Sequence, residues 1–583
     1  MLKLSRAALL AASLGLVMPA LTVLPAVAQE MAAPKFEVIV DVPSVVAVDS
    51  SMSESQIKDV FTSSFFSQAE NLARLTATSI TIPEISIKVS ASDGSEAFDS
   101  TAVYRDVVLT NIKDGYAETV TIGSSESVSA DGTTTYTTMT EDGFDLRRSL
   151  ELAGIVKGDP AAAMKAIYNS FSMAGGTHVG PAYNCSIGEI TGEKFEARPV
   201  KVQLADVIKA VQDNLTADDP PPEVIAIVVD YVGDILRAVS GGASSVGAID
   251  CDVPGDMPVK VSVGGITTGG FAPGIYPDFK ISGLAIDAGD LGNGALDEVA
   301  LKKIDLNPAL EALDSANGQF SEAWFEANWR KLIPSFEGFS FSGFAVDSIN
   351  PENPEERLEA KVDSFDLSLG NYVLGIPTDI SASLSGLEVP LPQDSSDPQL
   401  ATLLAAGLTK VNLGADVSAA WDEASSTIAV RKLALAAADL GSMSITADLG
   451  NATVDLFAID PNVALNAGMG MLVKGVTIRV ADEGLGEIVW PLAAAEQGQT
   501  DIEAFRTQMA GFAEGVALQL LGSTDAARQL GVALGDFVTG RKGEVTITIT
   551  AKDPNGIPLA YFIAAQEDPS ILTGQVDVTG SAS

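Results

Sequence analysis

Four segments of the chain share one pattern of apolar and polar positions. In each segment two apolar residues alternate with polar ones, a glycine follows, and two further apolar residues alternate with the phase shifted by one position. Alternation with a period of two predicts a half-buried strand, and a one-position shift would turn its second half to the opposite face. A β-bulge at the glycine cancels that shift and bends the strand. The pattern therefore predicts a curved, bulged sheet with one apolar face.

The apolar residues around these four glycines, Gly283, Gly343, Gly386 and Gly475, are candidate ligand-binding residues. The candidates are Phe279, Ile281, Leu284, Ile286, Phe339, Phe341, Phe344, Val346, Leu384, Leu387, Val473 and Val476. The alternative is that they form an ordinary core beneath the helices predicted over 53–75 and 502–538. Coverage separates the two interpretations, because an apolar face without a helix over it would be a groove.

Helical periodicity replaces strand periodicity between the two cysteines, Cys185 and Cys251. Apolar spacing predicts helices over 204–215 and 223–239, with Pro220–Pro222 between them. An exported chain with two cysteines usually pairs them, so we expect a disulfide at the base of this helical hairpin. The predicted fold class is α+β and mainly antiparallel β: a long curved, bulged sheet with amphipathic helices packed on it and an inserted, disulfide-closed helical hairpin.

The N-terminus has the layout of a secretory signal peptide. Lys3 and Arg6 precede an apolar run that ends at Ala26-Val27-Ala28, which predicts cleavage after Ala28 and a periplasmic location. No later segment is long and apolar enough to span a bilayer. The predicted organisation is a signal peptide (1–28), an N-terminal helix and β-meander domain (29–158), the helical insertion (159–275), a curved β region (276–400) and a C-terminal β region with a helix pair (401–583).

The net charge and the residue types present limit which partners, catalytic sites and metal sites the chain can have. A formal net charge of −42 repels nucleic acid, which argues against a nucleic-acid partner. His178 is the only histidine, and the chain has no nucleophile elbow, phosphate loop or dinucleotide fingerprint. The densest group of oxygen ligands, Asp287, Asp290, Asn293, Asp297 and Glu298, lacks the spacing of an EF-hand and reads as a solvated acidic loop. We therefore expect no catalytic residue, no metal site and no cofactor.

The repeated strand–glycine–strand units, the segment 103–107 (VYRDV) leading to 113–115 (KDG), and the run 421–450 resemble AsmA-like and YdgA-like bacterial envelope proteins. The resemblance covers residues 80–150 and 276–583. It implies a long curved sheet with an apolar inner face, and some relatives are implicated in moving or holding lipids between envelope membranes. Many of these proteins keep an N-terminal membrane helix, whereas this chain is expected to lose its signal peptide.

Together these features predict an exported, non-enzymatic binding or scaffold protein of the bacterial envelope. Its expected ligand is lipid-like or otherwise hydrophobic and lies on the curved apolar sheet. Two alternatives stay open. One is an envelope hydrolase that uses a pair of carboxylates about 5–9 Å apart. The other is a purely structural envelope protein without a ligand.

Overall fold

The computed structural model describes residues 36–62, 65–92, 97–214, 221–255, 257–350, 357–391, 403–405, 407–522, 524–565, 569–572 and 574–583. Its internal contacts divide the chain into two units. Unit 1 comprises the described residues up to Asn293 together with Glu298–Pro334, and unit 2 comprises Gly294–Asp297 and Ser335–Ser583. The predicted signal peptide lies outside the described residues. The predicted domain boundaries at 158, 275 and 400 remain predictions.

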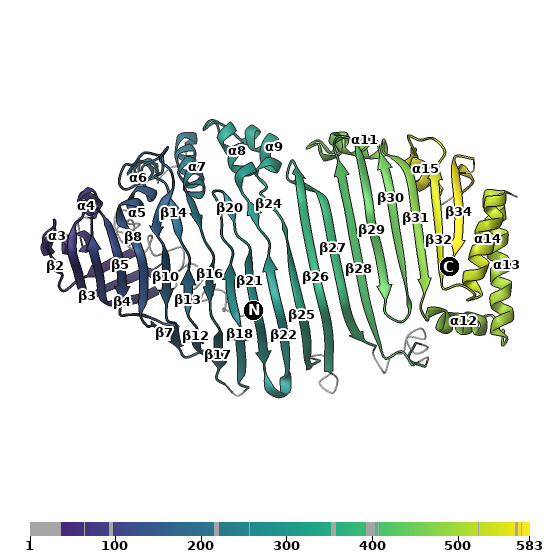
Figure 1. Ribbon diagram of the computed structural model, residues 1–583, viewed down its shortest axis with the longest axis horizontal. Coiled ribbons are helices and arrows are strands. Elements are labelled where there is room, and N and C mark those ends of the chain that lie inside the picture. The colour runs from purple at the N-terminus through teal and green to yellow at the C-terminus, as the bar shows by residue number, and fades with distance from the viewer. Residues whose placement is uncertain are drawn as a thin grey trace. The chain divides into compact units, whose positions relative to one another are not determined.

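Unit 1 is mainly antiparallel β-sheet with short helices (Figure 1). Its strands are β1 (Phe36–Asp41), β2 (Val46–Val48), β3 (Ala77–Ser92), β4 (Ala97–Ile112), β5 (Tyr116–Ile122), β6 (Ser124–Ser129), β7 (Gly132–Tyr136), β8 (Met139–Asp145), β9 (Lys165–Tyr168), β10 (Ser170–Met173), β11 (Gly176–Val179), β12 (Asn184–Ile187), β13 (Ile190–Gly192), β14 (Phe195–Ala197), β15 (Val239–Gly241), β16 (Ser244–Val246), β17 (Ile249–Val253), β18 (Val259–Val263), β19 (Gly265–Thr268), β20 (Ile275–Tyr276), β21 (Phe279–Asp287) and β23 (Ile304–Asp305). Its helices are α3 (Glu54–Thr62), α4 (Phe65–Leu72), α5 (Leu146–Leu152), α6 (Leu204–Gln212), α7 (Pro222–Arg237), α8 (Asn307–Ser315) and α9 (Glu322–Asn328).

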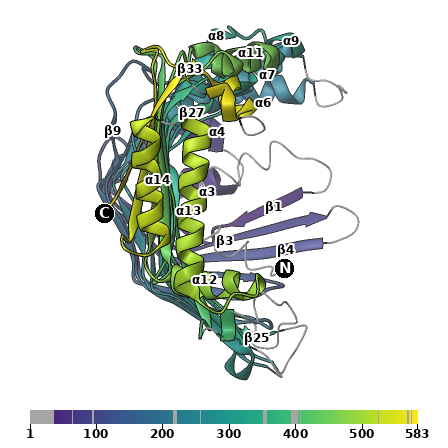
Figure 2. The ribbon, with the colours of Figure 1, turned by 90° about the vertical axis from the view of Figure 1, so that its right-hand side faces the viewer.

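Helices α3 and α4 cover the core at the start of unit 1. Ile57 on α3 and Leu72 on α4 are buried together with Ile80 and Ile82 of β3. Strands β1, β3 and β4 lie side by side in this region, as Figure 2 shows. Two short helices therefore occupy the range 53–75, and the buried strand residues beneath them are not among the candidate ligand-binding residues.

The predicted disulfide between Cys185 and Cys251 is confirmed. It joins β12 to β17, where the two cysteines lie directly opposite one another with their Cα atoms 4.1 Å apart. The predicted helices are confirmed as α6 and α7. The strand pairs β13–β16 and β14–β15 lie between these helices and the disulfide. The insertion is thus a long antiparallel hairpin that ends in two helices and is clamped at its base.

Unit 2 is mainly antiparallel β-sheet built from long strands, drawn side by side in Figure 1. Its strands are β24 (Ser335–Phe336), β25 (Gly338–Ile349), β26 (Arg357–Val373), β27 (Ile376–Pro390), β28 (Lys410–Asp422), β29 (Thr427–Ala437), β30 (Gly441–Gly450), β31 (Leu472–Asp482), β32 (Glu544–Ala551), β33 (Ile557–Pro558) and β34 (Val576–Ala582), while β22 (Gly292–Leu301) contributes to both units. Its helices are α11 (Pro461–Met469), α12 (Leu485–Glu496), α13 (Ile502–Leu521), α14 (Asp525–Val538) and α15 (Leu559–Ala564).

The predicted helix pair is confirmed as α13 and α14, which lie side by side at one end of the unit 2 sheet (Figure 2). Helix α14 packs on β34 and β32. Leu530 of α14 approaches so closely that a Cβ added at Gly580 would lie 2.7 Å from its Cδ1. Val545 of β32 is 3% exposed beneath this contact. The helix therefore covers the last strands of the sheet and protects an edge that would otherwise invite further strand pairing.

The predicted bulges occur at two of the glycine positions of unit 2, Gly386 and Gly475. Between β27 and β28 the register shifts, so that Leu384 and Leu387 pair with Ala415 and Leu413. A second shift lies beside Gly475, between β30 and β31. Because Ala415 and Leu413 alternate on one face of β28, Leu384 and Leu387 also share that face. These two bulges match the prediction, although Gly475 has no positive φ.

At Gly343 the predicted inserted residue is absent, because the neighbouring strand changes phase at the same level. Pairing of β25 with β26 and of β26 with β27 continues without a shift on both sides of Asp363, which lies opposite Gly343 and Gly386. Gly343 and Gly386 have φ of +65° and +63°. The same paired change occurs in unit 1, where Gly283 (φ +62°) lies opposite Gly264. Apolar residues on either side of these glycines therefore keep one face without a bulge.

We predict that Gly343→Ala lowers the stability of unit 2. A methyl group at Gly343 would meet the Asp297 side chain, with the Oδ2 atom at 2.1 Å and its Cβ at 2.6 Å, at a backbone conformation that disfavours alanine. The expected loss in the free energy of unfolding is about 1–3 kcal/mol, measured by urea denaturation. Gly370→Ala on β26 is the control, because its φ is not positive and its added Cβ would have its nearest contact at 3.9 Å. Equal stability of the two variants would show that the glycine conformation is not required.

Candidate functional site

The four candidate residues on β21 of unit 1 form a half-exposed apolar row. Ile281 lies opposite Ile266 of β19, and Ile286 lies opposite Val261 of β18. Ile286 is 44% exposed, and none of the four is buried. The row is therefore a surface of unit 1 and is not part of its buried core.

Three neighbouring strands of unit 2 bring six candidate residues to one face. Phe341 of β25 lies opposite Phe365 of β26, which in turn lies opposite Leu384 of β27. The rings of Phe339 and Phe341 contact the ring of Phe365, with centroids 5.3 and 5.5 Å apart. The remaining candidates on these strands, Phe344, Val346 and Leu387, follow the same cross-strand pairing. The sequence pattern missed Phe365, because β26 changes phase at an aspartate and has no glycine there.

The last two candidates, on β31, share this face through an unbroken series of strand pairs. Val476 lies opposite Ala447 of β30, and Val473 lies opposite Leu449. Val473 is 3% exposed, so it belongs to a local core and is unsuited to ligand contact. All eight candidate residues of unit 2 thus lie on one face of its sheet, and seven of them are at least partly exposed.

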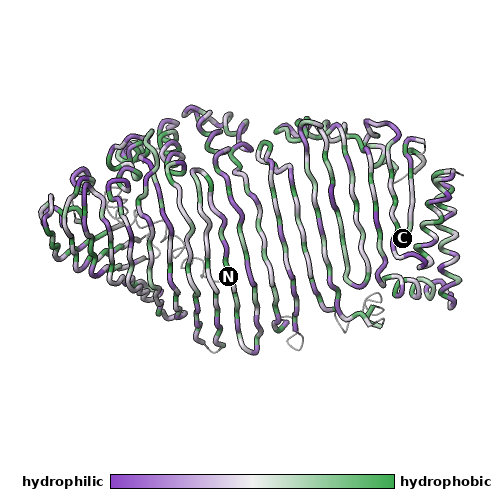
Figure 3. The backbone as a smooth tube through the Cα atoms, in the orientation of Figure 1, coloured by the Kyte–Doolittle hydropathy of each residue, from purple (hydrophilic) through white to green (hydrophobic). Residues whose placement is uncertain are grey.

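The most exposed part of this face comes from strands that the glycine pattern did not detect. Leu435 of β29 is 60% exposed, Leu433 is 45% exposed, and Met443 of β30 is 42% exposed. Side chains beneath a packed helix would be buried, so no described segment covers these residues. Figure 3 shows the alternation of apolar and polar residues along the same strands. We define the open apolar face by Phe339, Phe341, Phe344, Leu384, Leu387, Leu413, Val417, Leu433, Leu435 and Met443.

The reverse face of the unit 2 sheet is polar. The Ser364 and Ser385 hydroxyl groups lie 2.7 Å apart across β26 and β27. Lys432 of β29 forms an ion pair with Asp416 of β28 at 2.7 Å, on the side opposite the open apolar face. A sheet with one polar and one apolar face is typical of one-sided burial. Over strands β25–β30, no segment among the described residues forms the layer that would normally bury the apolar side.

His178 and the acidic stretch from Asp287 to Glu298 were the sequence features nearest to catalytic or metal-binding chemistry. The His178 ring stacks on Tyr183 at 4.7 Å, and its Nδ1 lies 2.9 Å from the Thr134 hydroxyl group. Within the described part of the chain, no group of three or more His, Cys, Asp or Glu side chains is arranged to hold a metal ion. The acidic stretch from Asp287 to Glu298 is therefore not brought together as a set of ligands among those residues.

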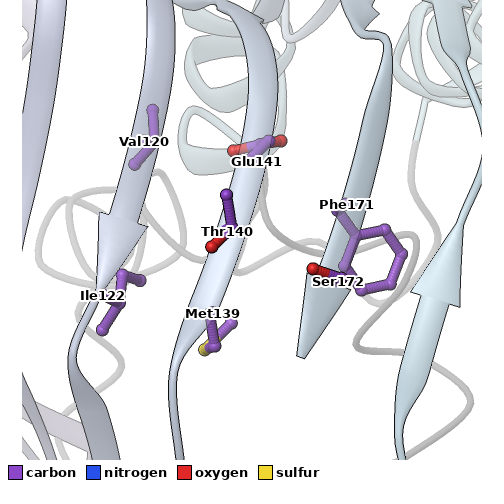
Figure 4. A pocket seen from close by; sticks show the side chains of 7 residues that line it. All are labelled: Val120, Ile122, Met139, Thr140, Glu141, Phe171 and Ser172. Atoms are coloured by element: carbon purple, nitrogen blue, oxygen red, sulfur yellow. The ribbon is translucent and has the colours of Figure 1, made fainter. Parts of the chain in front are cut away.

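Glu141 is an unusual residue that the sequence analysis did not single out. It lies on β8 between Val120 of β5 and Phe171 of β10 (Figure 4), and it is 7% exposed. Its Oε1 atom is buried and has no hydrogen-bond partner among the residues that the structure describes. Burial raises the pKa of Glu141 from 4.5 to about 8. The sequence gives no indication that this glutamate is buried, since a glutamate in a strand is usually at the surface.

Comparisons with known proteins give little further information. A family model described as "Uncharacterized protein" matches residues 434–583, a region that includes β30–β34 and helices α11–α15. No curated protein and no solved structure matches the chain. In the described part of the chain, every helix is too short or too polar to cross a bilayer. The resemblance to AsmA-like proteins therefore remains a prediction.

Glu141 should make unit 1 less stable as the pH rises. An unfolded chain releases this proton near pH 4.5, whereas the folded chain retains it to about pH 8, so folding loses free energy between these values. The loss attributable to Glu141 should reach up to about 5 kcal/mol. We expect the stability advantage of Glu141→Gln over the wild type to grow from pH 5 to 8 and then to level off, as measured by urea denaturation. Asp142→Asn, at the exposed neighbouring position, should show no such growth. A constant difference for Glu141→Gln would contradict the buried-acid assignment.

Proposed function

We propose that the protein is an exported, non-enzymatic binding protein of the bacterial cell envelope that holds lipid acyl chains on the open apolar face of unit 2. The observation that carries this proposal is the exposure of that face. Contiguous exposed apolar surface of this extent marks an interaction site in soluble proteins. Leu435, at 60% exposure, has the largest exposed fraction among the residues that define it.

The dimensions of the face suit extended hydrocarbon chains. Neighbouring strands lie about 4.8 Å apart, so the six strands from β25 to β30 extend roughly 24 Å across the sheet. That length exceeds half the thickness of a bilayer's hydrocarbon core, which is about 30 Å in total, so the face is wide enough for an extended acyl chain. Covering each half-exposed leucine, valine or methionine contributes about 1 kcal/mol. Several such contacts together can outweigh the entropy lost when a chain binds.

The proposed ligand contact is made by acyl chains and not by a charged head group. The residues that define the open apolar face are all apolar, whereas the charged side chains Asp416 and Lys432 pair on the reverse face. A lipid on this surface would keep its head group in water at the margin of the sheet. The net charge of −42 further disfavours binding through an anionic head group.

Three observations support placement in the envelope. The Cys185–Cys251 disulfide is typical of oxidising compartments. The first 28 residues have the composition of a cleavable signal peptide. The resemblance to AsmA-like and YdgA-like proteins also implies an envelope location, with an apolar sheet face that contacts lipid.

We expect Leu435→Asp to weaken the binding of a phospholipid with a fluorescent acyl chain by about tenfold or more. A charge on this face removes an apolar contact and must stay hydrated where the chain would lie. Binding is measured by fluorescence titration of protein purified without detergent. Ala436→Asp is the matched control, because the adjacent residue is exposed on the polar face and receives the same charge.

Equal binding by the two variants would contradict the proposed site. Loss of folding in Leu435→Asp, seen by circular dichroism, would show that Leu435 is core and would favour the purely structural alternative. Release of hydrolysed lipid during the titration would favour the carboxylate-dependent hydrolase.

A further inference from the structure

Two helices at one end of the unit 2 sheet have exposed apolar side chains and no charged residue. Helix α11 (PNVALNAGM) exposes Val463, Leu465 and Met469, and helix α15 (LAYFIA) exposes Tyr561 and Ile563. Leu465 is 65% exposed, more than any residue of the open apolar face. Grouped exposed apolar side chains of this kind mark an interaction site. We call these five side chains the end surface.

Both helices lie at the same end of the unit 2 strands, as Figure 1 shows. Helix α11 ends at Met469, and β31 begins three residues later at Leu472, which pairs with β33. The backbone N–H of Leu559, the first residue of α15, donates a hydrogen bond to the carbonyl oxygen of Met471 at 3.0 Å. The strand pairing therefore brings two segments far apart in the sequence to one end of the sheet.

The end surface adjoins the open apolar face. The 3₁₀ helix η3 (Val454–Phe457) precedes α11, and the ring of Phe457 contacts the ring of Trp421 with centroids 4.8 Å apart. Trp421 alternates with Val417 on β28, so both side chains lie on the same face of the sheet. The Trp421 indole Nε1 donates to the carbonyl oxygen of Ala452 at 2.7 Å. An aromatic pair thus links the open apolar face to the segment that leads into α11.

We propose that the end surface docks on a phospholipid bilayer, so that acyl chains pass between the bilayer and the open apolar face; this inference rests on the proposed acyl-chain binding. Leu465 and Met469 are four residues apart and share one side of α11. Such side chains enter the outer part of the acyl region when a helix lies in the membrane interface. Tyr561 lies at the level of the head groups, where aromatic rings with a polar tip are enriched.

The charge of the chain favours a zwitterionic bilayer as the partner. A net charge of −42 repels anionic head groups and also a second copy of the chain. Asp455 and Asp460 are exposed just before α11, and they add to this repulsion at the margin of the end surface. The two helices themselves have no charge that a bilayer would have to neutralise. We therefore expect phosphatidylcholine to be preferred to phosphatidylglycerol.

Flotation of the protein with phosphatidylcholine vesicles tests the proposal. The wild type should bind, and Leu465→Asp on α11 and Ile563→Asp on α15 should each weaken binding by about tenfold or more, because a charge is costly in the acyl region. Both positions are more than half exposed, so the added charge stays hydrated in the folded protein. Phe512→Asp is the matched control and should bind like the wild type, because Phe512 is equally exposed to solvent but lies on α13, outside the end surface. Vesicles that contain phosphatidylglycerol should bind more weakly, and high salt should reduce the difference.

Two further measurements separate docking from acyl-chain binding. Leu435→Asp should bind vesicles like the wild type but should take up little phospholipid with a fluorescent acyl chain from them. Leu465→Asp should bind the same phospholipid normally when it is supplied as a monomer, and should take it up from vesicles about tenfold more slowly. A wild type that binds vesicles through the end surface but binds no monomeric lipid would contradict the acyl-chain proposal and would support docking.

Equal vesicle binding by Leu465→Asp and the wild type would overturn the docking proposal, as would an equal loss in Phe512→Asp. A folded wild type that does not bind vesicles would do the same. If that wild type forms a dimer that Leu465→Asp dissociates, as seen by sedimentation velocity, the end surface is an interface between two copies of the chain.

Discussion

The structure of unit 2 depends on cross-strand register. Each strand must present its apolar residues to the same face although the alternation changes phase in the middle of several strands. Where two neighbours change phase at the same level, as β25 and β26 do at Gly343 and Asp363, the pairing continues unbroken. Where a neighbour such as β28 alternates without a change, a bulge absorbs the difference. Both solutions give a continuous apolar face, and glycine is needed where φ is positive.

A sheet built in this way has polar side chains on one face and apolar side chains on the other. Serine, threonine and ion pairs on one side keep the reverse face hydrated, whereas aliphatic and aromatic residues occupy the other. Helix α14 covers this face at β32 and β34, and strands β25–β30 have side chains that remain exposed. Exposed apolar surface raises the free energy of the protein in water, so its retention over several strands points to use of the surface.

The alternation pattern was sufficient to predict an antiparallel sheet with one apolar face. Helical spacing of apolar residues predicted the helix pair, and the presence of two cysteines in a chain expected to be exported predicted the disulfide. The alternation pattern could not decide whether the apolar face was covered, because coverage depends on where α14 packs and not on local periodicity. It also missed Phe365 and Leu435, since their strands lack the glycine that marked the other segments. Glu141 was not predictable for a different reason. Glu141 is buried because β8 pairs with β5 on one side and with β10 on the other. The sequences of these two strands do not indicate that they pair with β8.

The central claim is that the open apolar face of unit 2 holds lipid. Native mass spectrometry of the folded protein, purified without detergent, together with mass spectrometry of its organic extract, tests this claim most directly. The account predicts bound lipid in near-stoichiometric amount, released by the extraction and identified by its acyl chains. Protein that is folded, binds no added phospholipid and yields no lipid on extraction would contradict it.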